Sequence, residues 1–213
     1  MRMRIGELSR ETGVAVPTIK YYVREGLLPA GRLTSPNQAR YDDGHVRRLR
    51  LIRGLMDVGG LSVAKVREVL AAVDSPEEPV HKVLGTAQVA IAPPQVAAPD
   101  GMEEARRAVA GLIRRRGWRV APENPSVEAL AAALATLRGL GHGDFGELLD
   151  DYADACERVA AADLAWVGRN AEVDRLVESV VVGTVVGDAV LSAMRRLAHV
   201  DASARRYEGG EAV

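Results

Sequence analysis

Hydrophobic residues recur every three to four positions along most of this 213-residue chain, which is the period of an amphipathic helix. Near the N-terminus the pattern predicts a short helix from Leu8 that breaks at Gly13, and a second helix from Pro17 that ends at Gly26. Proline is tolerated in the first turn of a helix, and glycine often follows the last turn. Two short helices joined by a tight turn indicate either a helix-turn-helix or an ordinary helical hairpin. The pattern alone leaves both open.

Residues 30–45 are centred on Ser-Pro-Asn, which is a turn signal, so their short arms are predicted to pair as a hairpin. Helical spacing returns over residues 45–58, with apolar positions on one side and four arginines on the other. A further helix is predicted over residues 59–73, with Ser62 as its N-cap. A hairpin with an arginine on each arm suits a wing that lies on a nucleic-acid backbone.

Five of the ten prolines lie between residues 74 and 100, which indicates a linker. Within this linker, residues 80–92 have the spacing of a short coiled-coil-like helix, which we interpret as an interdomain or dimerisation helix. Residues 101–213 are predicted to be entirely helical, including a helix that starts at an Asp144 cap and reaches about residue 169. The chain is therefore expected to be mainly α, with a domain over residues 1–73, a linker over 74–100 and a helical bundle over 101–213.

The charge distribution and the cysteine content limit the classes of function that the chain can have. Residues 1–72 contain 13 Lys/Arg and 7 Asp/Glu, whereas the remainder contains 15 and 22. A basic head on an acidic body suggests that the head meets a polyanion. The one cysteine, Cys156, fits a reducing compartment and argues against a thiolate metal site. Because the chain shows neither a signal peptide nor an apolar run long enough for a membrane span, a cytoplasmic protein is expected.

Four segments of the first 72 residues occur in the order and at the spacing of the MerR family of transcriptional regulators: "IGELSRETGV", "TIKYYVREGLLP", "ARYDDGHVRRLRLI" and "GGLSVAKVREVL". The chain resembles that family over its first third, and residues 101–213 resemble no effector domain that we can name. The resemblance implies a homodimer whose two winged helix-turn-helix domains bind a palindromic operator in double-stranded DNA. It also implies that the dimer distorts the promoter so that RNA polymerase can engage it.

The resemblance further implies roles for individual residues. The helix that starts at Pro17 would lie in the major groove, with Thr18 and Lys20 facing the bases. Phosphate contacts would come from this helix, from the wing and from the helix that follows the wing, through Tyr21, Tyr22, Arg24, Arg32, Arg40, Tyr41, Arg47 and Arg48. One of the two adjacent tyrosines is expected to be a core residue, because neighbours on a helix point about 100° apart. The family usually has a serine where this chain has Ala15, which removes a helix cap.

The C-terminal residues point to no catalysis, cofactor or metal. Residues 141–146, "GHGDFG", match the sequence pattern of a dinucleotide-binding loop. That loop must follow a strand, and here a helix is predicted before it, so we do not interpret it as a cofactor site. Cys156 is expected on the buried side of its helix. A small organic effector could contact aromatic or carboxylate groups of this region, or these groups could be core or surface residues: Trp118, Tyr152, Trp166 and Asp188. Two other functions stay open, an architectural DNA-binding protein without a ligand and a helical enzyme with a DNA-binding head.

Overall fold

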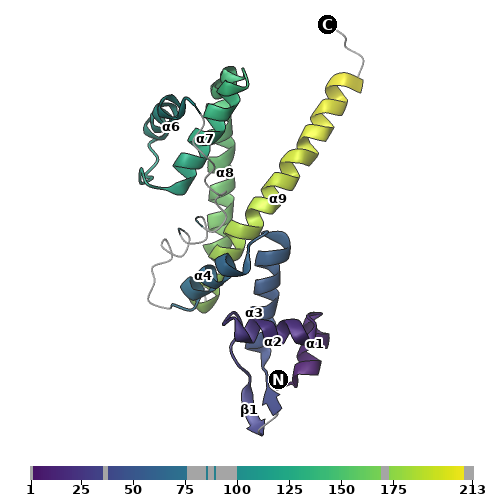
Figure 1. Ribbon diagram of the computed structural model, residues 1–213. Coiled ribbons are helices and arrows are strands. Elements are labelled where there is room, and N and C mark those ends of the chain that lie inside the picture. The colour runs from purple at the N-terminus through teal and green to yellow at the C-terminus, as the bar shows by residue number, and fades with distance from the viewer. Residues whose placement is uncertain are drawn as a thin grey trace. The chain divides into compact units, whose positions relative to one another are not determined.

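The computed structural model describes residues 2–35, 38–75, 85, 89, 100–168 and 173–208 (Figure 1). The chain divides into two compact units, one formed by residues 1–90 and 177–213 and the other by residues 91–176. Helices dominate both units, and the described strands form one two-stranded sheet, which confirms the mainly-α fold. Apart from residues 85 and 89, the predicted dimerisation helix lies outside the described residues. The division into residues 1–73, 74–100 and 101–213 stays a prediction.

The head begins with α1 (Ile5–Thr12) and α2 (Val16–Arg24), which form the helix-turn-helix. Gly13 follows α1 with a φ of 69°, a left-handed conformation that glycine adopts without strain and that lets the chain turn into α2. The N-cap residue of α2 is Ala15, which has no polar side chain, and as expected no side-chain hydrogen bond caps the helix. Pro17 lies in the first turn of α2. The structure therefore confirms the two helices that the sequence predicts near the N-terminus.

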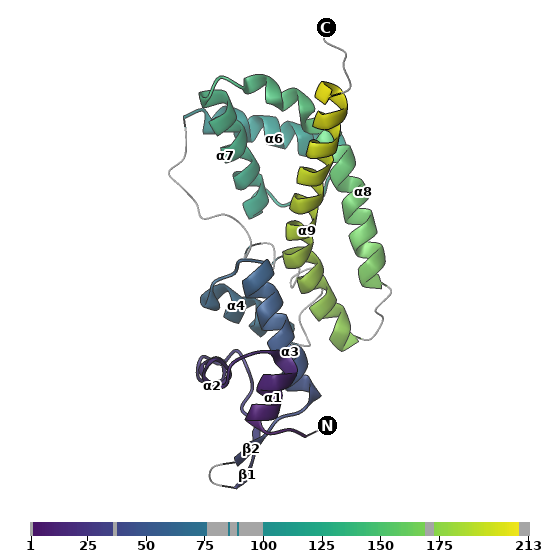
Figure 2. The ribbon, with the colours of Figure 1, turned by 90° about the vertical axis from the view of Figure 1, so that its right-hand side faces the viewer.

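The wing follows as β1 (Arg32–Ser35) and β2 (Gln38–Arg40), an antiparallel pair with a bulge between Leu33 and Ser35. The chain then forms α3 (Asp43–Arg53), a π-helical turn η1 (Gly54–Val58) and α4 (Val63–Val73). Figure 2 shows the hairpin extending beyond α1 and α2. Ser62 caps α4 by accepting a hydrogen bond from the backbone N–H of Lys65 at 3.4 Å.

Leucine, isoleucine and valine side chains fill the core of the head. The largest side chains that solvent does not reach come from α1, α2, the turn after α2, α3, η1 and α4: Leu8, Ile19, Leu27, Leu28, Leu49, Ile52, Leu55, Val66, Val69 and Leu70. Because each of these elements contributes to the core, burial of apolar surface fixes the position of α2.

The long helix α9 (Val173–Glu208) belongs to the same unit as the head from residue 177 onwards. Val181 and Val185 on this helix are buried. Val185 packs so closely against the end of η1 that a Cβ atom added to Gly59 would lie 2.2 Å from its Cγ1. Further along, α9 exposes large apolar side chains, among them Leu197 and Val200.

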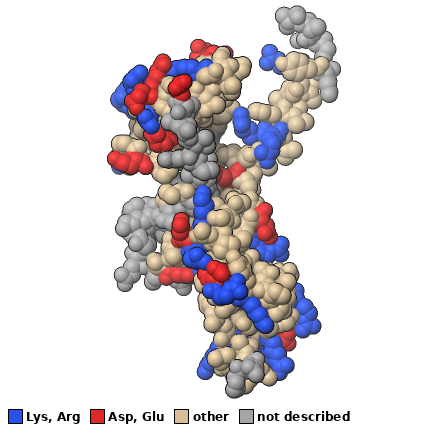
Figure 3. Space-filling model, viewed as in Figure 1, with Lys and Arg blue, Asp and Glu red and all other residues tan. Residues whose placement is uncertain are grey.

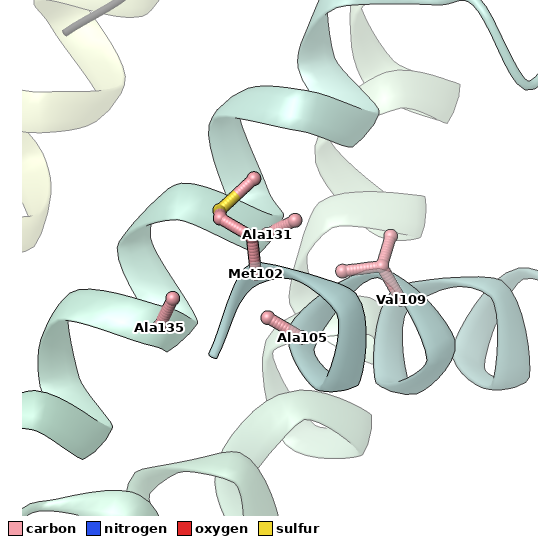
Figure 4. Packing of buried hydrophobic residues seen from close by; sticks show 5 residues of the cluster. All are labelled: Met102, Ala105, Val109, Ala131 and Ala135. Atoms are coloured by element: carbon pink, nitrogen blue, oxygen red, sulfur yellow. The ribbon is translucent and has the colours of Figure 1, made fainter. Parts of the chain in front are cut away.

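The second unit contains α6 (Met102–Arg116), α7 (Pro125–Gly139), a 3₁₀ turn η2 (Gly143–Leu148) and α8 (Leu149–Gly168). Met102, Ala105 and Val109 on α6 pack against Ala131 and Ala135 on α7 (Figure 4). The small alanine side chains allow the two helices to approach closely.

Ion pairs join the helices of the second unit. Arg106 on α6 donates to Glu128 on α7 through two nitrogens at 2.9 Å.

The α-helix predicted from Asp144 begins at Leu149 instead, and residues 143–148 form the 3₁₀ turn. Gly143 and Gly146 explain the difference, because glycine is a weak helix former.

Candidate nucleic-acid interface

One face of α2 points away from the core. Ile19 is fully buried, whereas Pro17, Lys20 and Arg24 are exposed and Thr18 is partly exposed. Residues 17, 20, 21 and 24 are three or four positions apart, so their side chains share one side of the helix. The structure therefore places Pro17, Lys20, Tyr21 and Arg24 on one accessible stripe, to which the predicted contacts Thr18 and Tyr22 do not belong.

The two adjacent tyrosines have different surroundings. Tyr21 is partly exposed, and the guanidinium of Arg24 lies 5.1 Å from the centre of its ring, within range of a cation–π interaction. Tyr22 is only 8% exposed, and its hydroxyl lies 3.6 Å from the sulfur of Met56. Burial is the main cause that raises the pKa of Tyr22. Tyr22 is thus the core member of the pair, and Tyr21 is the one that solvent can reach.

The wing places two arginines directly opposite each other. Arg32 on β1 and Arg40 on β2 are cross-strand partners, so their side chains lie on the same face of the hairpin. Like charges in this arrangement are destabilising in an isolated protein. A phosphate backbone would remove that repulsion, because each bound phosphate neutralises a cation. The pairing therefore suits a wing that meets nucleic acid.

Tyr41 holds the base of the wing. It is 7% exposed, its backbone forms a bridge with Met3, and its ring meets the ring of His45 edge-on at 5.1 Å. A Cβ atom at Gly31 would lie 2.9 Å from the Tyr41 ring, so glycine is required for this close approach. Burial raises the pKa of Tyr41. Its side chain therefore packs under the wing, and we do not include it among the phosphate contacts that we propose.

Arg47 and Arg48 on α3 also differ. Arg47 is exposed, whereas the side chain of Arg48 is only 13% exposed. The Nε of Arg48 donates to the backbone carbonyl of Leu27 at 2.9 Å, and its two terminal nitrogens donate to the carboxylate of Asp74 at 2.7 and 2.5 Å. Arg48 therefore ties the turn after α2 to the end of α4, and we assign it a structural role.

Other arginines of the head are neutralised by carboxylates. Ion pairs join Arg50 to Glu11 at 3.1 Å and Arg67 to Glu25 at 3.0 Å. In contrast, Lys20, Arg32, Arg40 and Arg47 make no ion pair with another residue in the part of the chain that the structure describes. Figure 3 shows Lys and Arg side chains over the part of the head that carries the wing. Cations without an ion pair thus lie on α2, the wing and the start of α3, although Arg24 of α2 pairs with Glu25 at 3.4 Å, and α1 adds Arg10, which donates to the Gly6 carbonyl.

The four residues considered for an effector have different local surroundings. The indole N–H of Trp118 donates to Glu157 at 2.8 Å, and the ring of Tyr152 lies 5.8 Å from that of Phe145. Trp166 is 39% exposed, and Asp188 is exposed on α9. Trp118 and Tyr152 are therefore engaged in contacts that hold the second unit together.

The second unit has a cleft of about 190 Å³ between α6, α7 and η2. Its lining combines apolar groups, such as Leu134 and Phe145, with the polar side chains of Arg115, Arg138 and His142. Arg115 pairs with Asp150 at 3.1 Å, and Arg138 pairs with Glu104. None of the four effector candidates lines this cleft. No sequence pattern indicates this cleft, because the turn at residues 141–146 meets α7 only in the folded chain.

Cys156 corrects one expectation, since it is exposed rather than buried. The buried position of this stretch of α8 is Ala153, one turn earlier, so the inner side of the helix is narrower than the sequence pattern indicates.

Among the described residues, no three His, Cys, Asp or Glu side chains are grouped as a metal site would require. None of the described helices has an apolar stretch long enough to span a membrane.

Comparison with known proteins agrees with this geometry. Residues 3–73 match the profile described as "MerR HTH family regulatory protein". The crystal structure of the proposed transcriptional regulator SCO5550 from Streptomyces coelicolor A3(2) is similar over 99% of this chain and 100% of that one, with 40% sequence identity and a TM-score of 0.73.

Curated relatives match the N-terminal part. Nodulation protein NolA of Bradyrhizobium elkanii is 34% identical over 91 residues, which are 43% of this chain and 41% of NolA. The mercuric resistance operon regulatory protein of Bacillus cereus is 35% identical over 77 residues, 36% of this chain and 58% of that protein. The chain thus spans about half the length of these two relatives.

Proposed function

The chain belongs to the MerR family of transcriptional regulators, and we propose that it binds a palindromic promoter operator as a homodimer, distorts the DNA and responds to a small organic effector. Within this proposal, α2 enters the major groove with Thr18 and Lys20 at the base edges. Tyr21, Arg24, Arg32, Arg40 and Arg47 contact phosphates.

One observation carries the DNA-binding part of the proposal. Lys20 on α2, Arg32 and Arg40 on the wing and Arg47 on α3 have no ion-pair partner among the described residues, whereas Arg50 and Arg67 of the head are paired with carboxylates. Arg32 faces Arg40 across the wing, and like charges directly opposite each other destabilise the isolated protein. A polyanion on this face removes that cost and releases its own counterions.

Distortion of the operator follows from the form of the interface. A recognition helix and a wing on each of two heads provide many backbone contacts, and such contacts can offset the energy needed to bend and untwist DNA. The promoter would then present its two polymerase-binding elements in a usable arrangement, so RNA polymerase is an indirect partner.

Two observations support an organic effector. The sequence has one cysteine, whereas soft-metal sites are usually built from several thiolates. The cleft between α6, α7 and η2 joins apolar groups to two arginines and a histidine, a combination that suits a small molecule with an apolar body and a polar group. An effector that binds one conformation of the protein better than another would shift the population of the DNA-distorting state.

The wing provides the test. Arg40→Ala should weaken binding to every DNA sequence and reduce the slope of log K against log salt concentration by about 0.9, because one phosphate contact is lost. Arg107→Ala, which removes an exposed arginine of α6, is the matched control and should change neither quantity. Both are measured by fluorescence anisotropy over a salt series. An Arg40→Ala protein with the affinity and slope of the wild type would refute the interface.

A further inference from the structure

We propose that the cleft between α6, α7 and η2 binds a small organic anion, a carboxylate on an apolar body, through Arg115 and Arg138. The bound carboxylate takes the place of the protein carboxylate with which each arginine now pairs. This inference rests on the proposed function in one respect, since it concerns the same effector. It goes further in naming the charge of the effector, the two residues that recognise this charge and the contacts that the effector breaks.

The first observation is the charge of the cleft. Among the described residues that line it, Arg115 and Arg138 bring positive charge, and no aspartate or glutamate contributes. The acidic residues of η2, Asp144 and Glu147, line a separate hollow next to it, which shares His142 with the cleft. An anion is therefore attracted into the cleft, whereas a cation would meet two like charges.

The second observation is that these two arginines are held less firmly than two others of the same unit. Arg106 and Arg116 each contact two carboxylates, and neither lines the cleft. In contrast, Arg115 and Arg138 each contact one carboxylate through one nitrogen in the part of the chain that the structure describes. Because a guanidinium has five N–H donors, most donors of these two arginines are available to a ligand.

The present partners of the two arginines can be displaced. Arg115 pairs with Asp150 and Arg138 with Glu104, and the four side chains are each between 45% and 58% exposed. An ion pair that solvent reaches in this way contributes little free energy. The carboxylate of a ligand can bind a guanidinium through two parallel hydrogen bonds, which is the stronger arrangement. Exchange of a protein carboxylate for that of the ligand is therefore favourable.

Two glycines leave room for the arginine side chains. A Cβ atom added to Gly111 would lie 3.6 Å from a terminal nitrogen of Arg115, and one added to Gly143 would lie 3.9 Å from Nε of Arg138. The guanidinium of Arg115 thus lies one turn back along α6, as long side chains on a helix commonly do. Arg138 reaches from α7 to the first residue of η2. The two cations therefore approach the cleft from two different helices.

The apolar part of the lining fits the body of such a ligand. Ala105, Ala108, Leu134 and Phe145 line the cleft, and Ala105 also belongs to the core between α6 and α7 (Figure 4). The cleft of about 190 Å³ is smaller than the pockets of about 300 Å³ or more that bind drug-sized molecules. We therefore expect a carboxylate that carries one ring or a short chain.

Three compounds with one apolar body and different charges test the ligand class: benzoate, benzamide and benzylamine. In isothermal titration calorimetry with the full chain, benzoate should bind at least tenfold more tightly than the neutral and the cationic compound. Equal binding of either one that Ala108→Trp abolishes would overturn the anion but leave an organic effector in the cleft. If neither benzoate nor hexanoate bound, the inference would be wrong, and the salt slope of Arg40→Ala would still decide whether the head binds DNA as proposed.

Two arginine variants test the residues that recognise the charge. Arg115→Gln and Arg138→Gln should each weaken benzoate binding at least tenfold, because each removes a charge-assisted hydrogen bond to the ligand. Arg114→Gln is the matched control, since Arg114 is exposed on the same helix and does not line the cleft. Circular dichroism checks that all three variants keep their helices. Wild-type affinity in both cleft variants would overturn the proposal.

Removal of the competing carboxylates tests the exchange itself. Glu104→Gln and Asp150→Asn each free one cleft arginine, so each should strengthen benzoate binding by about twofold to fivefold, as expected for the loss of an exposed ion pair. Glu128→Gln removes a partner of Arg106, which does not line the cleft, and should leave benzoate binding unchanged. Benzoate binding that is unchanged or weaker in both Glu104→Gln and Asp150→Asn would show that no protein carboxylate is displaced, and the exchange would be refuted.

Discussion

At the scale of single residues, Arg47 and Arg48 are neighbours in the sequence with opposite surroundings. Arg48→Ala removes hydrogen bonds to the Leu27 carbonyl and to Asp74, so we expect the free energy of unfolding to fall by about 1–2 kcal/mol. This range allows for the exposure of Asp74 to solvent. Arg47→Ala removes an exposed side chain and should change stability by less than about 0.5 kcal/mol. Urea unfolding measures both.

The same two variants separate stability from DNA binding. Arg47→Ala should reduce the salt dependence of DNA binding, as expected for a lost phosphate contact. Arg48→Ala should keep the wild-type salt slope under conditions in which it is folded. If the two slopes were exchanged, Arg48 rather than Arg47 would be the residue that contacts phosphate.

Tyr22 predicts a loss of stability in alkaline solution. Burial raises its pKa in the folded protein above the ordinary value of 10.0. The unfolded chain therefore ionises first, so stability is complete below about pH 10 and falls as pH rises through the folded pKa. Tyr22→Phe cannot ionise at this position and should lose less stability than the wild type between about pH 9 and about pH 11. Thermal unfolding at several pH values shows the difference, and Tyr207→Phe, at an exposed tyrosine, is the control.

At the scale of elements, the contact between η1 and α9 is open to a steric test. Gly59 has an ordinary φ of −75°, so alanine causes no backbone strain there, but its Cβ would lie 2.2 Å from Val185 and 2.7 Å from the carbonyl oxygen of Leu55. We expect Gly59→Ala to destabilise the protein by about 1–3 kcal/mol. Adding Val185→Ala should recover part of this loss, because one of the two clashes is removed. A double-mutant cycle by urea unfolding measures the coupling between the two residues.

A matched glycine gives the opposite expectation. Gly6 lies in α1 with no atom within 4 Å of an added Cβ. Gly6→Ala should therefore stabilise the protein by about 0.5–1 kcal/mol, because alanine is the better helix former. If Gly59→Ala were as stabilising as Gly6→Ala, the packing of α9 against η1 would be wrong.

The elements themselves were largely readable from the sequence. Apolar spacing, Pro17 and Ser62 predicted α2 and α4, since these signals act within one or two helical turns. The roles of Arg47 and Arg48 were not readable, because the partners of Arg48 lie 21 and 26 residues away. Spacing also could not distinguish the π-helical turn η1 from the α-helix before it, since both place apolar residues on one side.

At the scale of the whole molecule, the division into residues 1–73, 74–100 and 101–213 stays a prediction, and in the structure α9 from residue 177 onwards belongs to the same compact unit as the head. Prolines and charge mark a linker in the sequence, but they cannot show which unit a distant helix joins. In this unit Val185 of α9 lies against Gly59 of the head.

The nature of the regulatory signal is also a property of the whole molecule, and Cys156 tests it. A soft-metal or redox sensor needs an accessible thiolate that usually acts with a second ligand or thiol, and this chain has one cysteine. We expect Cys156→Ser to change the free energy of unfolding by less than about 0.5 kcal/mol, because the side chain is exposed. Operator binding and regulation in cells should match the wild type.

The measurement is expression from a responsive promoter under oxidant, copper, zinc and mercury challenge, with wild type and Cys156→Ser in parallel. We expect neither protein to respond, because a single thiol gives a soft metal one strong ligand where stable sites provide several. Native mass spectrometry of the protein purified from its own host should instead show a retained small molecule, and Ala108→Trp, which fills the cleft between α6, α7 and η2, should abolish that retention. A wild-type response to metal or oxidant that Cys156→Ser lacks would replace the organic effector with a thiol-based signal.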